Sequence, residues 1–519
     1  MWMFLLACTP MEGPDAADVR YTGATFWTAP GAWTDALAVT DGRVVAVGSD
    51  AHALEAREVQ DLGGAFVTPG LHDAHTHLFA GSFVTRRILL QLATSMDGVA
   101  AQVGSYASSH PDEPWLVGFG WTPTLAEPDG RVLDEVAPDR PVLLVASSGH
   151  AAIANPYALA LAGIDASTPD PVGGEIVRDP ATGEPTGLLL ETAVEPVITR
   201  ALAAYDDDAV LDDLRAELEA AASTGLTSVS EILGAPGVDL VRPQLFTRLD
   251  AAGELPLRVH LWVPVRAASD LDALEGLRDS LGTDPATRVR FAGAKVWVDG
   301  SLAGEEAWTV EPWAAGDHGS AYLDEATLTA LVARAEALGM PLKVHAMGDA
   351  ALDATLRAFE AQSTLSVQHS VEHASLLTDA ARARFASLGL VASIQPLSRS
   401  LTPFATWHDD LPSWEADASY DFGALLAAGA PLAVGTDYPT VPVIDPLVTL
   451  GAVHTDTRSG SIGIEAALEG YTAGSGRSAG LDGMLGCLEV GCIADLSVFA
   501  SDPTRDPAEN RVLKTVIAE

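Results

Sequence analysis

The sequence contains little positive charge. Its 519 residues include 29 Lys and Arg against 71 Asp and Glu, which gives a formal net charge of −42. This deficit excludes an electrostatic nucleic-acid-binding surface and disfavours adhesion to anionic lipid. Lysine is the scarcest cation, since only Lys295, Lys343 and Lys514 occur. A lysine inside an apolar run therefore needs a specific explanation, because a buried ammonium is costly unless it is paired, neutralised or chemically changed.

Cysteine and long apolar runs are also scarce. The three cysteines are Cys8, Cys487 and Cys492, and three do not make a disulfide framework. No segment approaches the roughly 18 apolar residues of a membrane span. With 48% hydrophobic and 19% charged residues, the composition is typical of a globular protein, and the length predicts one large domain with a smaller one.

The N-terminus carries a short apolar run that ends in Ala7 and Cys8. This run resembles the end of a bacterial lipoprotein signal, so we expect residues 1–18 to be a signal and tether, with lipidation at Cys8 and export to a membrane-anchored position. The run is shorter than usual and lacks a preceding basic residue. The alternative is a cytoplasmic protein with an apolar N-terminus.

Two histidines two residues apart, His75 and His77, follow an apolar lead-in at residues 65–67. We interpret the lead-in as a buried strand that runs into a Pro-Gly break before the pair. Because strand side chains repeat with period two, both imidazoles should project to the same side, as neighbouring ligands of one metal ion require. The alternative is a pair of polar residues in a turn.

Strand-like apolar runs alternate with helical patterns along most of the chain, and eight such runs predict an α/β protein with a (β/α)8 barrel. The runs lie at residues 65–67, 227–232, 257–265, 292–298, 341–346, 366–372, 390–395 and 431–434.

Further segments belong outside the barrel. Hairpin patterns at residues 19–66 and strand-like runs within 485–519 predict one small β-sandwich domain built from both termini. The barrel then spans residues 67–484. The interval at 84–200 is too long for one crossover, so we expect an inserted subdomain beside the barrel mouth, where insertions often contact substrate.

Polar residues recur at the predicted strand ends: Lys295 lies in one strand, His345 and His373 end two others, and Asp437 follows another. The carboxyl ends of barrel strands meet at one face, so these side chains should converge with the histidine pair. Lys295 could pair with Asp299 or extend towards solvent, or it could react with CO2 to form a carboxylate that bridges two metals.

These motifs resemble the metal-dependent amidohydrolase superfamily, and within it the amidohydrolase-3 group that includes N-substituted formamide deformylases. The motifs that match are residues 69–77, Lys295 with 299–302, 345–349, 371–373, 395–396 and 435–439. Further segments also look like the group: Ser148 to His150 with Asn155, residues 173–175, 184–187 and 471–472, and the segment 486–495.

The resemblance implies a divalent metal, most often zinc, as one or two ions. It implies ligation by His75, His77, His345, His373 and Asp437, with Lys295 as an N6-carboxylysine bridge. Asp437 would act as general base and then general acid, and we assign His150 to the substrate oxygen. The expected substrate-binding residues are His150, Asn155, Asp299, Gln395 and Tyr438.

The function that follows is hydrolysis of a non-peptide C–N bond, amide or formamide-like, through a metal-bound hydroxide. We expect the protein to bind a small-molecule substrate and no nucleic acid. The sequence leaves open whether the chain forms a homodimer. One alternative is a deaminase of an aminated heterocycle in the same superfamily. Another is a non-catalytic ligand-binding lipoprotein. Ser370 and Ser398 stand where relatives often carry Arg and His, which leaves the substrate open.

Overall fold

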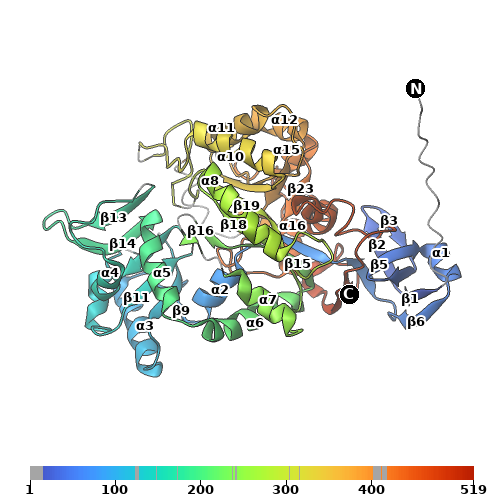
Figure 1. The fold of residues 1–519 in the computed structure, drawn as a ribbon, viewed down its shortest axis with the longest axis horizontal. Helices are drawn as coiled ribbons and strands as arrows, with labels where there is room; N and C mark the ends of the chain where they lie inside the picture. The colour runs from blue at the N-terminus through green and yellow to red at the C-terminus, as the bar shows by residue number, and fades with distance from the viewer. Residues whose placement is uncertain are drawn as a thin grey trace.

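The computed structural model describes residues 16–122, 125, 128–147, 149–171, 173–235, 238–239, 242–302, 304–314, 316–400, 411 and 418–518. Three bodies lie in a row, with the barrel in the middle, an inserted subdomain at one end and the sheets of the terminal domain at the other (Figure 1). Cys8 lies outside the described residues. Within these ranges, no helix is both long and apolar enough to cross a bilayer.

The central body is an eight-stranded parallel sheet that closes into the predicted (β/α)8 barrel. Asp437 N donates to His75 O at 2.8 Å and His77 N donates to Tyr438 O at 2.8 Å, so the first and last strands meet. The Asp73 carboxylate strengthens this seam, since it accepts hydrogen bonds from the Thr436 hydroxyl at 2.7 Å and the Thr436 N–H at 3.0 Å. The strands are β8 (Leu71–Thr76), β15 (Leu226–Ile232), β18 (Arg258–Pro264), β19 (Val289–Trp297), β20 (Leu342–Ala346), β21 (Ser370–His373), β22 (Val391–Ile394) and β23 (Leu432–Val434).

Helices cover the outside of this barrel (Figure 1). Their apolar faces pack on the strands, as the period of buried residues in α11 shows at Leu352, Leu356 and Phe359. The helices are α2 (Leu78–Thr85), α6 (Asp207–Ser223), α7 (Pro243–Ala251), α8 (Ala268–Ala273), α9 (Glu275–Leu281), α10 (Glu325–Leu338), α11 (Asp349–Glu360), α12 (Asp379–Leu388), α15 (Phe422–Ala427), α16 (Pro446–Thr455), α17 (Ile464–Glu469) and α18 (Ser475–Ser478).

The apolar lead-in at residues 65–67 does not belong to the barrel, so this part of the prediction is wrong. It forms β7 (Phe66–Pro69), which pairs with β24 (Leu496–Phe499) and β2 (Thr25–Ala29) of the terminal domain. The break at Pro69 and Gly70 separates β7 from β8, because proline supplies no N–H for a continuing ladder. His75 therefore lies within β8, whereas His77 lies just beyond it, at the start of α2.

The terminal domain combines both ends of the chain, as predicted. One sheet has the order β5 (Arg43–Val47), β4 (Leu37–Thr40), β1 (Ala17–Thr22), β6 (Ala56–Asp61), and α1 (Gly48–Ala53) follows β5. The second sheet has the order β25 (Val512–Val516), β24 (Leu496–Phe499), β7, β2 (Thr25–Ala29), β3 (Ala32–Thr34). Residues close to the C-terminus thus pair directly with the strand that precedes the barrel.

The insertion after β8 has a sheet of its own, also as predicted. Its order is β13 (Gly174–Arg178), β14 (Pro185–Glu191), β12 (Ala151–Ala154), β11 (Val142–Ala146), β10 (Leu116–Trp121), β9 (Ile88–Leu89). Helices α3 (Met96–Ser109), α4 (Pro156–Ala162) and α5 (Glu195–Ala203) accompany the sheet. Leu143 and Val145 pack into the core shared with the barrel, whereas Leu144 packs in a separate core within the insertion.

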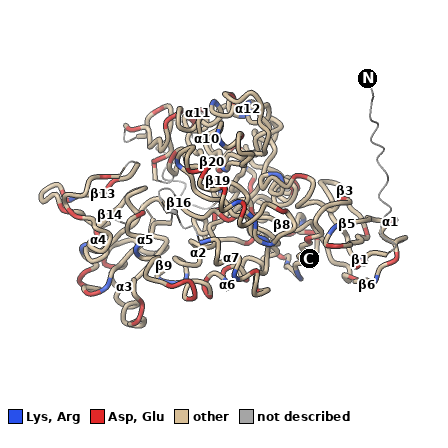
Figure 2. The backbone as a smooth tube through the Cα atoms, in the orientation of Figure 1, with Lys and Arg blue, Asp and Glu red and all other residues tan. Residues whose placement is uncertain are grey.

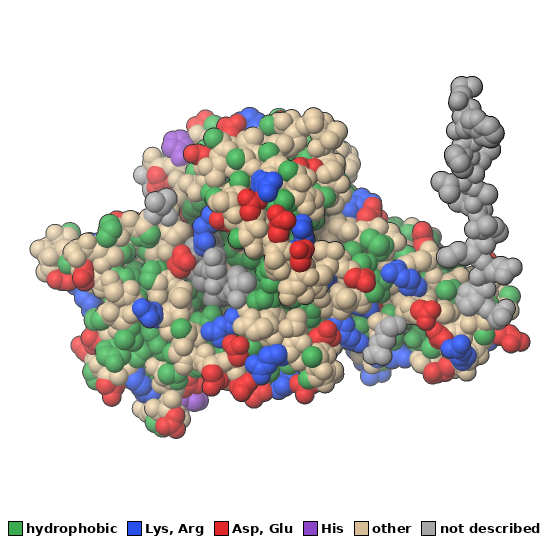
Figure 3. All heavy atoms as spheres, in the orientation of Figure 1, with side chains coloured by type: hydrophobic (Ala, Val, Ile, Leu, Met, Phe, Trp, Pro, Cys, Tyr) green, Lys and Arg blue, Asp and Glu red, His purple; other side chains and the backbone are tan. Residues whose placement is uncertain are grey.

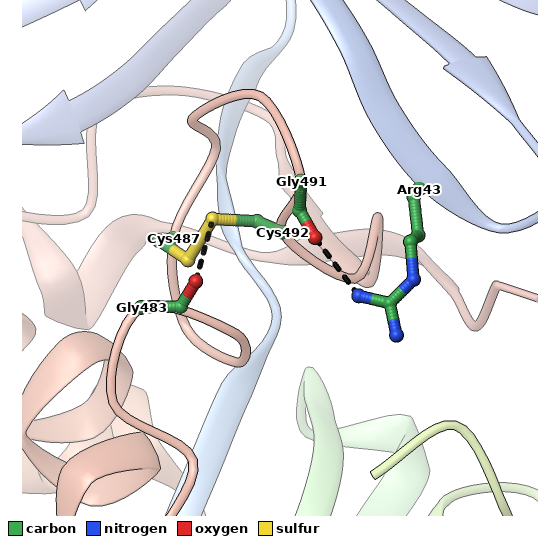
Figure 4. Close-up of a disulfide and its surroundings, with 5 residues drawn as sticks. All are labelled: Arg43, Gly483, Cys487, Gly491 and Cys492. Atoms are coloured by element: carbon green, nitrogen blue, oxygen red, sulfur yellow. Dashed lines mark hydrogen bonds between the residues drawn. A yellow bond between two sulfur atoms is a disulfide. The ribbon is translucent and has the colours of Figure 1, made fainter. Parts of the chain in front are cut away.

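A disulfide joins Cys487 and Cys492, with 5.8 Å between their Cα atoms (Figure 4). Sequence reasoning missed this bond, because it considered only the number of cysteines. Gly486 and Gly491 have positive φ values of 73° and 98°, which lets the intervening loop fold back on itself. Arg43 of β5 donates a hydrogen bond to Gly491 O at 2.9 Å and ties this loop to the N-terminal sheet.

Acidic residues occur along the backbone of all three bodies, with basic residues among them (Figure 2). On the face in Figure 3, Asp and Glu are scattered among basic and apolar side chains and form no single patch.

Candidate metal centre

Three polar side chains meet where β8 and β23 adjoin. The ligand atoms of His75, His77 and Asp437 all lie within 4.8 Å of one another. Asp437 Oδ1 is 3.4 Å from the Nε2 atoms of both histidines. This geometry brings the predicted His pair and the aspartate from opposite ends of the barrel sequence to one point.

Two further histidines extend this cluster. The ring of His373, at the end of β21, is 4.9 Å from the ring of His75, and the ring of His345, on β20, is 4.5 Å from that of His373. His373 Nδ1 bonds to Gln395 Oε1 at 2.7 Å, which leaves its Nε2 available to a ligand. The structure therefore brings together the four histidines and the aspartate that the sequence singled out.

The backbone at two of these residues is unusual. His373 has φ 71° and Asp437 has φ 61°. Residues other than glycine rarely adopt this left-handed region, and the strain tends to persist only where the surroundings over-determine it, often at functional sites. At His373 and Asp437 this conformation turns the chain at the strand end, beside the other ligand candidates.

Burial sets the protonation states of the cluster. It lowers the pKa of His75 and His345 well below the usual value and that of His373 to about 4. Burial alone would raise the pKa of Asp437, but the hydrogen bond from His77 and the charges of neighbouring imidazoles lower it below its usual range. Neutral imidazoles beside an ionised carboxylate are the forms that bind divalent metals.

Lys295 of β19 is fully buried, and its Nζ has no hydrogen-bond partner among the described residues. The Nζ lies 5.2 Å from the centre of the Trp297 ring. Burial lowers the pKa of Lys295 to about 7, and the Lys343 cation acts in the same direction against the opposing charges of Glu372 and Asp437. The predicted alternative of a Lys295–Asp299 ion pair is absent from the interactions of the described residues.

His150 approaches the cluster from the insertion, with its ring 6.2 Å from that of His345. Its Nδ1 is 3.0 Å from Glu191 Oε2, at the end of β14, and 3.9 Å from Glu306 Oε2. Burial would lower the pKa of His150, but the Glu191 carboxylate raises it above its usual value. Burial raises the pKa of Glu306 well above its usual value, and Glu191, which hydrogen-bonds to it, adds to this effect. Sequence reasoning missed both glutamates.

Two predicted substrate contacts support other residues of the site instead. The Asp299 carboxylate accepts hydrogen bonds from Met347 N at 3.0 Å, Gly348 N at 2.8 Å and Trp308 N at 3.0 Å. It thereby holds the loop after β20, next to His345. Gln395 is engaged by His373 and is 2% exposed, so it orients that imidazole.

The other two residues predicted to contact substrate, Asn155 and Tyr438, make their contacts elsewhere in the fold. Asn155 Oδ1 accepts from Val142 N at 2.9 Å and Ala158 N at 3.0 Å, and its Nδ2 donates to Asp134 and Arg140 at 3.0 Å each. These bonds use its full capacity to cap α4 inside the insertion.

Tyr438 is directed away from the centre. Its phenol hydrogen-bonds to Glu217 of α6, and burial raises its pKa. A Cβ on Gly81 of α2 would lie 2.9 Å from its ring. Tyr438 therefore packs between the barrel and its outer helices.

Sequence reasoning also missed the support of His75. His75 Nδ1 is 2.6 Å from Glu372 Oε2, and Lys343 Nζ is 3.1 Å from Glu372 Oε1. Burial would raise the pKa of Glu372, but Lys343 and His75 hold it well below its usual value. A signal was available, since Lys343 precedes His345 by two residues on one strand and should share its inward side.

Known proteins resemble this chain over almost its full length. The model of the amidohydrolase family matches residues 58–519. YtcJ of Bacillus subtilis is 31% identical over 93% of this chain and 95% of its own length. N-substituted formamide deformylase of Arthrobacter pascens is 28% identical over 93% of each chain. The solved structure of an uncharacterised metal-dependent hydrolase from Pyrococcus furiosus is 25% identical, with a TM-score of 0.72 over 94% of this chain and 100% of that chain.

Proposed function

This chain belongs to the amidohydrolase family of metal-dependent hydrolases, and from that premise we propose that it hydrolyses a non-peptide C–N bond of the amide or formamide class. The observation that carries the proposal is the convergence of His75, His77 and Asp437 at one end of the barrel. The similarity to a formamide deformylase supports this choice of bond.

The donor set fits a divalent ion, and we propose zinc. Zinc prefers imidazole nitrogen and carboxylate oxygen, and His75, His77, His345, His373 and Asp437 offer both. Such an ion lowers the pKa of a water towards neutrality and polarises a carbonyl. We also propose that Lys295 is carboxylated. Its Nζ has no hydrogen-bond partner among the described residues, and a carbamate on this nitrogen would supply an anionic ligand for two metal ions.

The protein's own groups would then handle the protons. Asp437 is ionised and in contact with both His75 and His77, so its carboxylate can take a proton from the attacking water and return it to the leaving nitrogen. His150 keeps a proton on Nδ1 for Glu191. Its Nε2–H would remain to hold the substrate oxygen as negative charge develops there.

The test joins metal content to a substrate panel. Purified protein should contain at least one divalent ion per chain and should release formate or another carboxylate from N-substituted amides. Replacement of His345 by Ala should abolish turnover and lower the metal content while the fold is retained, since this barrel buries a large core without the ion. Ammonia release from aminopyrimidines or aminopurines, without amide cleavage, would instead favour the deaminase. A metal-free wild type would favour the ligand-binding alternative.

We propose further that the chain is exported and lipidated at Cys8. The disulfide between Cys487 and Cys492 supports export, because such bonds persist mainly in oxidising compartments. Mass spectrometry of protein from its native host should find a diacylated or triacylated N-terminus at Cys8. An unmodified Met1 on protein from the cytosolic fraction would contradict export.

A further inference from the structure

A buried chain of hydrogen bonds runs from the interior of the barrel to His75. Ser478 of α18 accepts a hydrogen bond from Lys343 Nζ at 2.7 Å, and Lys343 Nζ also lies 3.1 Å from Glu372 Oε1. Glu372 Oε2 is 2.6 Å from His75 Nδ1. Lys343, Glu372 and the His75 side chain are all at most 1% exposed.

The ammonium of Lys343 has a partner for each of its N–H donors. The ammonium of Lys343 has three N–H donors, and its partners are Glu372, Ser478 and, at 3.4 Å, Ser370 Oγ. Glu372 Oε1 also accepts from the Ser370 hydroxyl at 2.6 Å. Because Lys343 and Ser370 are neighbours in the register of β20 and β21, the cation reaches Glu372 from the adjacent strand.

The position of Glu372 determines which nitrogen of His75 faces the cluster. A carboxylate can only accept, so the bond at 2.6 Å places the proton of the neutral imidazole on Nδ1. The Nε2 lone pair is then directed to the side of Asp437, where Nε2 lies 3.4 Å from Oδ1. A carboxylate behind a histidine ligand in this way also increases the basicity of the ligand.

We propose that Lys343 is a positioning residue for the metal centre, acting on His75 through Glu372. Lys343 is the lysine in direct contact with the buried Glu372 carboxylate, and its removal would leave that carboxylate without a lysine or arginine at ion-pair distance among the described residues. This inference rests on the proposed function, because it needs His75 to bind a metal. It gives a role to Lys343, which is one of two buried lysines in a chain that has only three lysines.

The experiment uses Lys343→Met, Glu372→Gln and the double variant. Lys514→Met is the matched control, because Lys514 is exposed on β25 and its Nζ contacts Gln60 at 3.3 Å. Zinc affinity is measured by competition with a chromophoric chelator, and the melting temperature is measured on the metal-free proteins. Lys343→Met should weaken zinc binding about 10- to 100-fold, the usual cost of losing such a supporting partner, and Lys514→Met should leave it unchanged.

The double variant separates positioning from folding. Gln can accept from His75 Nδ1 without charge, so the double variant removes both buried charges and should recover the melting temperature that Lys343→Met loses. Its zinc affinity should remain below that of wild type, because a neutral amide polarises the imidazole less than a carboxylate. Wild-type zinc affinity in a folded Lys343→Met protein would overturn the inference, as would a double variant that recovers affinity fully. A wild type that binds no zinc would overturn the proposed function first.

Discussion

Arg258 of β18 forms a buried ion pair with Asp495, with Nε 2.7 Å from Oδ2 and both side chains 1% exposed. The pair joins the barrel to the segment just before β24, and Arg258 Nη2 donates to Ala518 O at 2.6 Å. Asp495 also accepts from Ala518 N at 2.8 Å. The end of the chain is thereby fastened to the barrel through one arginine and one aspartate.

Replacement of Arg258 by Met should destabilise the protein by about 3–5 kcal/mol, because breaking a buried pair leaves Asp495 charged and uncompensated. Urea unfolding of the metal-free protein measures this loss. Arg57→Met is the control, since its pair with Asp18 is exposed and should contribute less than about 1 kcal/mol. Equal losses in the two variants would show that Arg258 does not fasten the terminal domain.

The disulfide gives a second stability prediction. The two cysteines are five positions apart, and chain entropy assigns about 2 kcal/mol to closing so short a loop. Cys487→Ser should lower the free energy of unfolding by about this amount under oxidising conditions and by nothing in the presence of reductant. A variant that loses the same stability in both conditions would show that side-chain packing, not the bond, is responsible.

The positions of the metal-binding candidates could be predicted from sequence because they depend on few inferences. Strand boundaries place His345, His373 and Asp437 at strand ends, and barrel topology then requires those ends to meet. Pro69 and Gly70 were correctly interpreted as a break, but the partner of β7 is β24, far away in sequence. Periodicity alone cannot choose between partners at that separation.

The supporting groups were harder to predict. Glu372 and Lys343 meet through the register of β20 with β21. His150 meets Glu191 because β12 pairs with β14 inside the insertion, and it meets Glu306 because the insertion lies against the barrel mouth. The contacts of Asn155 and Tyr438 were not predicted, since a polar residue near a motif can equally cap a helix or contact an outer helix. Whether such a side chain caps a helix, contacts an outer helix or reaches the site depends on its direction in three dimensions.

The pair of His150 and Glu191 predicts a pH effect. The Glu191 carboxylate raises the pKa of His150, so the imidazolium that would hold the substrate oxygen persists to higher pH than it otherwise would. In Glu191→Gln the alkaline fall of kcat should move to lower pH, with little change on the acid side. Glu184→Gln, on the exposed hairpin of the insertion, should keep the wild-type profile. An unchanged alkaline limb in Glu191→Gln would remove His150 from the proposed mechanism.

The final prediction concerns carboxylation of Lys295. The reaction with CO2 needs a neutral amine, and burial lowers the pKa of this lysine to about 7, whereas an ordinary lysine is almost fully charged at that pH. Carbamate formation in metal-free protein with bicarbonate should therefore increase as the pH rises through about 7, and 13C NMR with labelled bicarbonate can follow it. Lys295→Ala should lose most of the activity and at least one metal per chain, and acetate should restore part of both by filling the vacated space with a carboxylate. Lys514→Ala should show neither effect. An electron-density map that ends at the Lys295 nitrogen, with a single metal in protein prepared with bicarbonate, would show a mononuclear site and would leave the family assignment intact.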